Sequence, residues 1–396
     1  MKYTYKHTMR ACYMGYITQA IVNNLAPILF IIFQDQYNIS LEMLGRLILI
    51  NFGTQIIVDL LTVKYVERIG YRKATVIAHI CCALGLMSLG ILPQIMSKPY
   101  IGLTIAVVIY AIGGGIIEVL ISPIVEFLPG EEKASAMSLL HSFYCWGQVG
   151  VVLITTFLLK LMGGDMWFVL PIMWASIPLY NLTRFLKVPI VEPHAEVETM
   201  STRALLSTRG FVIALLLMLA AGASELTMSQ WSSLFAEQGL QVPKVIGDLL
   251  GPCLFAVLMG IGRMVYGIWG HKINLNRALL GSGILCIVCY ALTIFATHPL
   301  VSLLGCAVCG LSVSLMWPGT FSLTSATYPR GGTVMFGILA VFGDIGAAMG
   351  PWIAGVVSDR AGLGLKAGLL VAIIFPVLLV VGILALKNIA VPDELK

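Results

Sequence analysis

Twelve apolar stretches, each long enough to cross a lipid bilayer, fill almost all of this sequence. A membrane-spanning helix needs about 20 consecutive apolar residues. The stretches are residues 11–33, 44–66, 74–94, 100–128, 134–161, 166–187, 210–235, 245–270, 277–297, 300–326, 334–357 and 366–386. Only 11% of the residues are charged, against about 25% in a soluble domain. We therefore expect an all-α membrane protein of twelve transmembrane helices.

The chain divides near its centre. The longest polar stretch separates the sixth and seventh apolar stretches, so we expect two six-helix bundles, residues 1–187 and 210–396, joined by a central loop, 188–209. The halves also repeat a pattern: Pro123 precedes a GQVG run by 24 residues, and Pro318 precedes a GDIG run by 25. Two parallel six-helix repeats are typical of transporters that bind their solute at the repeat interface. The loops offer neither a soluble domain nor a catalytic constellation, so we do not expect an enzyme or a receptor.

Basic residues predict the orientation, because cytoplasmic loops carry an excess of lysine and arginine. Of the 24 basic residues, 17 lie at the two termini, in the central loop, or in other loops on that same side. We therefore expect an integral plasma (inner) membrane protein with both termini in the cytoplasm. The net charge of +5 is modest, and we expect no nucleic-acid partner.

Ionisable side chains within apolar spans are costly and mark functional sites. Five are prominent in this sequence: Glu118, His141, Glu225, Arg263 and Asp344. Glu118 lies about 14 Å from the cytoplasmic end of its span and His141 about 10 Å from the same face of the next span, at 1.5 Å per residue. Because the two share a depth, we predict that they carry the coupled proton. The alternatives are a structural hydrogen bond for Glu118 and simple packing for His141.

In the second half, Glu225 and Asp344 are predicted to bind solute hydroxyls or to form an ion pair with Arg263. Arg263 is also close enough to the cytoplasmic end to extend its side chain there. Amide and aromatic side chains share the same spans and suit a neutral polyhydroxylated solute, although each could instead bond or pack between helices. The predicted solute-binding residues are Asn23, Asn24, Tyr144, Gln148, Glu225, Gln230, Trp231, Trp317 and Asp344.

The loop after the second span reads VKYVERIGYRK. It resembles the conserved loop of the major facilitator superfamily, Gly-x-x-x-Asp-Arg-x-Gly-Arg-Arg, with Val63 in place of the first glycine. The resemblance implies a gating loop, a charged latch between helix ends that breaks and re-forms as the halves rock. The gating residues implied by the resemblance are Glu67, Arg68, Gly70, Arg72 and Lys73.

Within that superfamily the sequence is similar to the fucose:proton symporter family, on the stretches GGGIIEVLISP, SLLHSFYCWGQVG, GASELTMSQW and GPWIAGVVSD. The resemblance implies that Glu118 is the protonatable glutamate. It also places Asn23 where the family has an aspartate, so one carboxylate of the family pattern is absent.

We therefore predict a secondary active transporter that takes up a sugar or similar small polar solute by proton symport. The alternative is a multidrug or metabolite efflux antiporter of the same superfamily, although the fifth span lacks the Gly-Pro typical of such antiporters. The expected partners are the solute, protons and the lipid bilayer. We expect a monomer with no cofactor and no metal.

Overall fold

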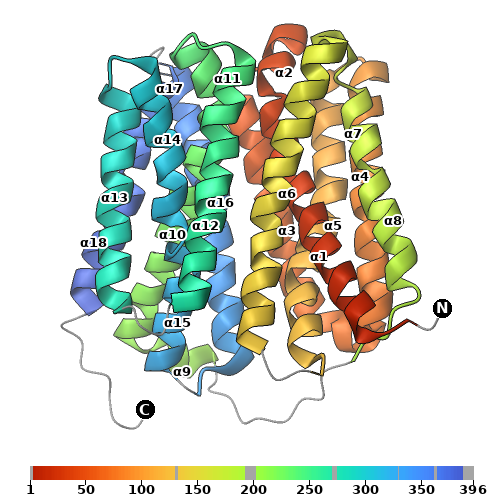
Figure 1. Ribbon diagram of the computed structural model, residues 1–396, viewed down its shortest axis with the longest axis vertical. Coiled ribbons are helices and arrows are strands. Elements are labelled where there is room, and N and C mark those ends of the chain that lie inside the picture. The colour runs from red at the N-terminus through yellow and green to blue at the C-terminus, as the bar shows by residue number, and fades with distance from the viewer. Residues whose placement is uncertain are drawn as a thin grey trace.

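Long helices run side by side along the long axis of the molecule, with the first half of the chain on one side and the second half on the other (Figure 1). The computed structural model describes residues 3–129, 133–191, 202–269, 274–328, 330–360 and 364–386. These residues form helices and turns, without a strand. We call the end where α1 and α10 begin the inner end, and the opposite end the outer end, after the predicted orientation.

The described part of the first half contains nine helical segments. They are α1 (Tyr5–Ile28), α2 (Phe30–Tyr37), α3 (Leu41–Ile69), α4 (Tyr71–Ile95), α5 (Pro99–Phe127), α6 (Lys133–Met162), η1 (Gly164–Met166), α7 (Val169–Trp174) and α8 (Ser176–Phe185).

The second half begins with a short helix that follows the central loop. Its segments are α9 (Thr202–Leu206), α10 (Arg209–Leu234), η2 (Phe235–Gly239), α11 (Lys244–Asp248), η3 (Leu249–Cys253), α12 (Leu254–Trp269), α13 (Leu275–Phe295), α14 (Pro299–Val313), α15 (Met316–Thr327), α16 (Gly332–Arg360), α17 (Leu365–Ala372) and α18 (Ile374–Leu386).

Among the described residues, ten helical spans are long and apolar enough to cross a membrane, and the pair α1 and α2, bent by 44°, makes an eleventh when it is counted as one span. The remaining predicted stretch, 166–187, folds as two shorter helices, α7 and α8. A proline explains this break: Pro178 is the third residue of α8 and has no N–H to bond the carbonyl four residues earlier. Pro318 and Pro376 hold the same place in α15 and α18.

Among the described residues, two pairs of long helices make the most extensive contacts between the halves. α16 packs along α3, and α12 packs along α6. Near the outer end the first pair is very close, because a Cβ on Gly45 would lie 3.3 Å from the Cα of Trp352, and one on Gly355 would lie 2.8 Å from the carbonyl oxygen of Leu41. Glycine at both positions lets the two backbones approach, so the interface between the halves is tight at this end.

Candidate functional site

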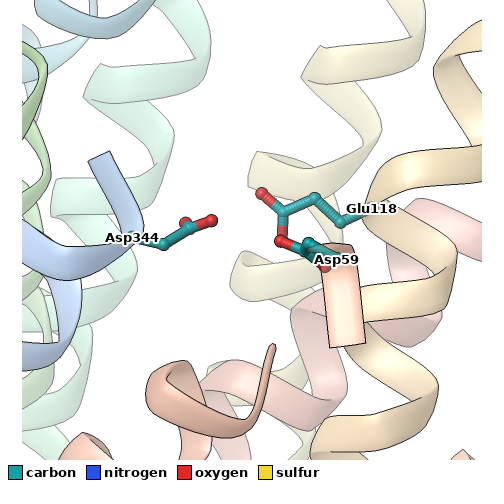
Figure 2. A group of neighbouring side chains, drawn as sticks. All are labelled: Asp59, Glu118 and Asp344. Carbon is teal, nitrogen blue, oxygen red and sulfur yellow. The ribbon is translucent and has the colours of Figure 1, made fainter. Parts of the chain in front are cut away.

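Three carboxyl groups meet where the two halves face each other (Figure 2). Asp59 of α3 and Glu118 of α5 belong to the first half, and Asp344 of α16 belongs to the second. One oxygen from each lies within 4.8 Å of the others. We call these three residues the acidic cluster. Its residues come from three helices that are distant in the sequence. α3 packs against α5 within the first half and against α16 across the interface between the halves.

Among the described residues, few hydrogen bonds and no opposite charges stabilise the carboxyls of the acidic cluster. Gln19 donates to Glu118 through its Nε2 at 2.6 Å. Asp59 Oδ1 and Asp344 Oδ2 are buried without a hydrogen-bond partner, and none of the three carboxyls is in an ion pair with a described residue. Three close carboxylates repel one another, so sharing a proton or a small cation stabilises the group. The geometry would accommodate either.

Glycines of the GGG run shape the site. A Cβ on Gly115 would lie 2.8 Å from Asp59 Oδ1, and one on Gly114 would lie 3.3 Å from the side-chain carbonyl carbon of Gln55. Glycine therefore lets α5 approach α3 closely, one turn before Glu118. The Oε1 of Gln55 at this contact is buried without a hydrogen-bond partner.

His141 is connected to Glu118 only indirectly. Its exposed ring stands edge-on to the ring of Tyr16, with 5.1 Å between centroids. The Tyr16 hydroxyl bonds Ser122 Oγ at 2.8 Å, and Ser122 lies one turn beyond Glu118 on α5. The predicted coupling between His141 and Glu118 therefore has no direct hydrogen bond among the described residues, and a proton role for His141 stays a prediction.

A second polar centre pairs opposite charges. Arg263 of α12 donates through Nη2 to both carboxylate oxygens of Glu225 of α10, each at 3.3 Å. Arg263 Nη1 also contacts Cys145 Sγ across the interface at 3.7 Å. Of the two predicted partners for Arg263, Glu225 is therefore the one it meets, and Asp344 lies in the acidic cluster instead.

Asn23 anchors a buried amide network in the first half. Its Oδ1 accepts hydrogen bonds from Asn51 Nδ2 at 3.1 Å and Gln55 Nε2 at 2.9 Å. Pro27 has no N–H for the Asn23 carbonyl, which instead accepts from Gln230 Nε2 of the second half at 3.1 Å. The proline thus frees a backbone acceptor for a contact between the halves.

The other predicted solute-binding residues are scattered. Asn24 Nδ2 reaches the Tyr144 hydroxyl at 3.3 Å, so these two lie together. Gln148 is buried on α6. Trp231 is fully buried and donates to the Pro351 carbonyl at 2.9 Å, so in this structure it packs against protein. Trp317 packs beside Phe321, with 6.3 Å between ring centroids.

The predicted gating loop forms the turn between α3 and α4. Gly70 adopts φ 85°, a left-handed conformation that favours glycine. Arg72 donates to the carbonyls of Phe185 and Val188 at 2.7 and 2.8 Å, tying the turn to the end of α8. Arg68 and Lys73 are exposed. The side chain of Glu67 lies outside the described residues.

The sequence reading missed two buried acids, Asp59 and Asp248. Asp59 interrupts the apolar run TQIIVDLLT, and Asp248 interrupts KVIGDLLGP. Both fall inside predicted spans, so the criterion that selected Glu118 would have found them. Asp59 lies at the cluster with 6% of its surface exposed, and Asp248 is fully buried near the outer end.

Comparison with solved structures shows what this fold is similar to. An E. coli fucose:proton symporter, FucP, aligns with a TM-score of 0.66 at 17% identity, covering 96% of this chain and 98% of that one. A D-xylose-proton symporter aligns with a TM-score of 0.77 at 16% identity, covering 98% and 97%. The nucleoside transporter NupG aligns with a TM-score of 0.76 at 11% identity, covering 96% and 98%. At these identities the likeness establishes the fold.

No curated protein sequence gives a significant match. A family model does: residues 12–351 match that of the major facilitator superfamily. The expected fold is thereby confirmed, as a multi-pass membrane transporter. With the match spanning most of its length, this chain belongs to the major facilitator superfamily.

Proposed function

We propose that this transporter takes up a sugar or similar small polar solute together with protons. The observation that carries the coupling is the acidic cluster, three carboxyls within 4.8 Å contributed by both halves without a cationic partner among the described residues. Repulsion makes proton binding favourable at such a group. Because Asp344 belongs to the other half, the protonation state affects how closely the halves approach.

The solute class is supported by uncharged polar groups on helices of both halves. Asn24, Tyr144 and Gln230 carry donors and acceptors on three helices from both halves. Such groups bind hydroxyls, and the Glu225–Arg263 pair adds charged hydrogen-bonding groups without a net charge. Two of the similar solved structures are described as symporters of sugars with protons.

In the proposed cycle, residues 1–187 rock against residues 210–396. A proton binds at Glu118 and lowers the repulsion toward Asp344. The solute binds between the halves near the midplane. With both bound, the halves change from one arrangement to the other, and the site opens to the opposite side. The basic inner end would face the cytoplasm of a cell whose plasma membrane holds the protein as a monomer.

Proteoliposome transport tests the proposal. Purified protein would be assayed for counterflow with a panel of radiolabelled sugars and polyols, and for accumulation driven by a pH gradient. Glu118→Gln should retain counterflow and lose gradient-driven accumulation by about 100-fold, since the group can no longer exchange its proton. The matched control is Glu42→Gln, which neutralises a partly exposed glutamate at the outer end of α3.

Normal accumulation by Glu118→Gln would show that the coupling role is wrong. Exchange of hydrophobic cations, with no sugar or polyol exchanged, would instead favour the antiporter alternative.

A further inference from the structure

A buried acid near the outer end receives hydrogen bonds from both halves. Asp248, the last residue of α11, is fully buried. Thr156 of α6, in the first half, donates to its Oδ2 at 2.6 Å. Ser233 of α10, in the second half, donates to its Oδ1. Lys244 forms an ion pair with it, with Nζ 3.3 Å from Oδ2, and the same Nζ lies 3.7 Å from Glu237 Oε1.

Lys244 makes the complementary connection. Its Nζ donates to the carbonyl of Ile28 at 2.9 Å. Ile28 is the last residue of α1, next to the 44° bend into α2. The carbonyls at a helix end attract cations, so this position suits an ammonium group. Asp248 and Lys244, both of the second half, thus each form one hydrogen bond with a residue of the first half.

Other polar contacts surround this pair. Gln238 Nε2 donates to Gln34 Oε1 at 2.8 Å, in addition to the bond from Gln230 to the Asn23 carbonyl. The backbone changes here as well, because α10 and α11 each pass into a π-helical turn, η2 and η3. Single π-helical turns are frequent at functional sites. Asp248 is directly followed by η3, which contains Pro252.

We propose that Asp248 and Lys244 form an outer lock that holds the halves together while the transporter is closed at the outer end. Opening this end would separate Thr156 from Asp248 and Ile28 from Lys244. The bonds from Ser233 to Asp248 and between Asp248 and Lys244 lie within one half and would survive. The Thr156 hydroxyl therefore stabilises the closed arrangement specifically. The inference requires only that the halves separate, so it is independent of the solute and of the coupling ion.

The test compares two hydroxyls that bond the same carboxylate. Thr156→Val removes the bond between the halves and keeps the side-chain shape. Ser233→Ala removes the bond within one half. Nitroxide labels on Ile95→Cys and Phe295→Cys, two strongly exposed positions at the outer ends of α4 and α13, would report the separation of the halves by double electron–electron resonance. The partly exposed Cys81 would be replaced by serine throughout.

Thr156→Val should shift the ratio of closed to open molecules about tenfold toward open, the size expected for losing a hydrogen bond to a charged group. This shift would be seen as a new population at a longer distance between the two nitroxide labels. Ser233→Ala should keep the parent distribution, and Thr156→Ser, which retains the hydroxyl, should restore it. An unchanged distribution in Thr156→Val would overturn the proposal. An equal shift in Ser233→Ala would do the same, because it would show a general loosening.

If Thr156→Val does not yield a monodisperse protein, Lys244→Met provides the second variant. It removes the ammonium that donates to the Ile28 carbonyl, at a side chain that is partly exposed. A shift toward the open arrangement supports the lock, and an unchanged distribution contradicts it.

Discussion

The acidic cluster and the Glu225–Arg263 pair both lie in the interior of the bundle, but they balance charge differently. The cluster places carboxyls from both halves within 4.8 Å of one another, without a cationic partner among the residues that the structure describes. The second centre neutralises its glutamate with an arginine at 3.3 Å, and both residues belong to the second half. The acidic cluster is stabilised by binding a positive charge, whereas the Glu225–Arg263 pair already has no net charge.

This difference in charge suggests that the two groups have separate roles in transport. A group that needs a proton and spans the interface can sense both the gradient and the arrangement of the halves. A neutral pair within one half can hold its position throughout the cycle and orient a solute. The lock around Asp248 adds a third arrangement, a paired acid whose partners come from both halves.

The largest effect is expected from breaking the neutral pair. Arg263→Met leaves the Glu225 charge buried and unpaired, which costs about 3–5 kcal/mol of stability. Thermal unfolding of the purified protein should show a clearly lower midpoint, and counterflow should be lost. The double variant Glu225→Gln with Arg263→Met restores neutrality and should recover most of the stability. If the double variant is as unstable as the single one, the two charges do not balance each other.

A smaller effect is expected from removing one carboxyl of the cluster. Asp344→Asn reduces the repulsion on Glu118, so the remaining groups hold a proton less tightly. Transport falls as the pH rises and the proton is lost, and in the variant the pH of half-maximal accumulation should move lower by about one pH unit or more. Uptake measured from pH 5 to pH 9 would show this. Asp359→Asn, at an exposed position of the same helix, should leave the profile in place. An unmoved profile in Asp344→Asn would exclude that residue from the proton site.

The smallest effect is expected from Asn23→Asp. A carboxylate in Asn23→Asp can accept the same two amide donors, Asn51 Nδ2 and Gln55 Nε2, so the unfolding midpoint should change little. Asn23→Leu should lower it clearly, because each buried amide left unbonded costs about 1–3 kcal/mol. Equal stability of the two variants would show that the amide network is not important for the fold.

The length and hydropathy of the apolar stretches were sufficient to predict the membrane class and the all-helical fold. The positions at which helices break were harder to predict from the sequence. Pro178 lies inside a predicted span and splits it, and the bend after Pro27 divides α1 from α2. A proline in a sequence indicates a missing hydrogen bond, but whether the helix bends depends on what else bonds the free carbonyl. At Asn23 that partner is Gln230, 207 residues away.

From the sequence we could predict that the chain spans a lipid bilayer, that its two halves share a residue pattern, and that Glu118 is costly to bury. These follow from local composition and spacing, which the bilayer constrains directly. Which acids share a site depends on the tertiary structure. Asp59, Glu118 and Asp344 come from three helices, and Arg263 pairs with Glu225 because helix packing, which no single segment encodes, sets which side chains face each other.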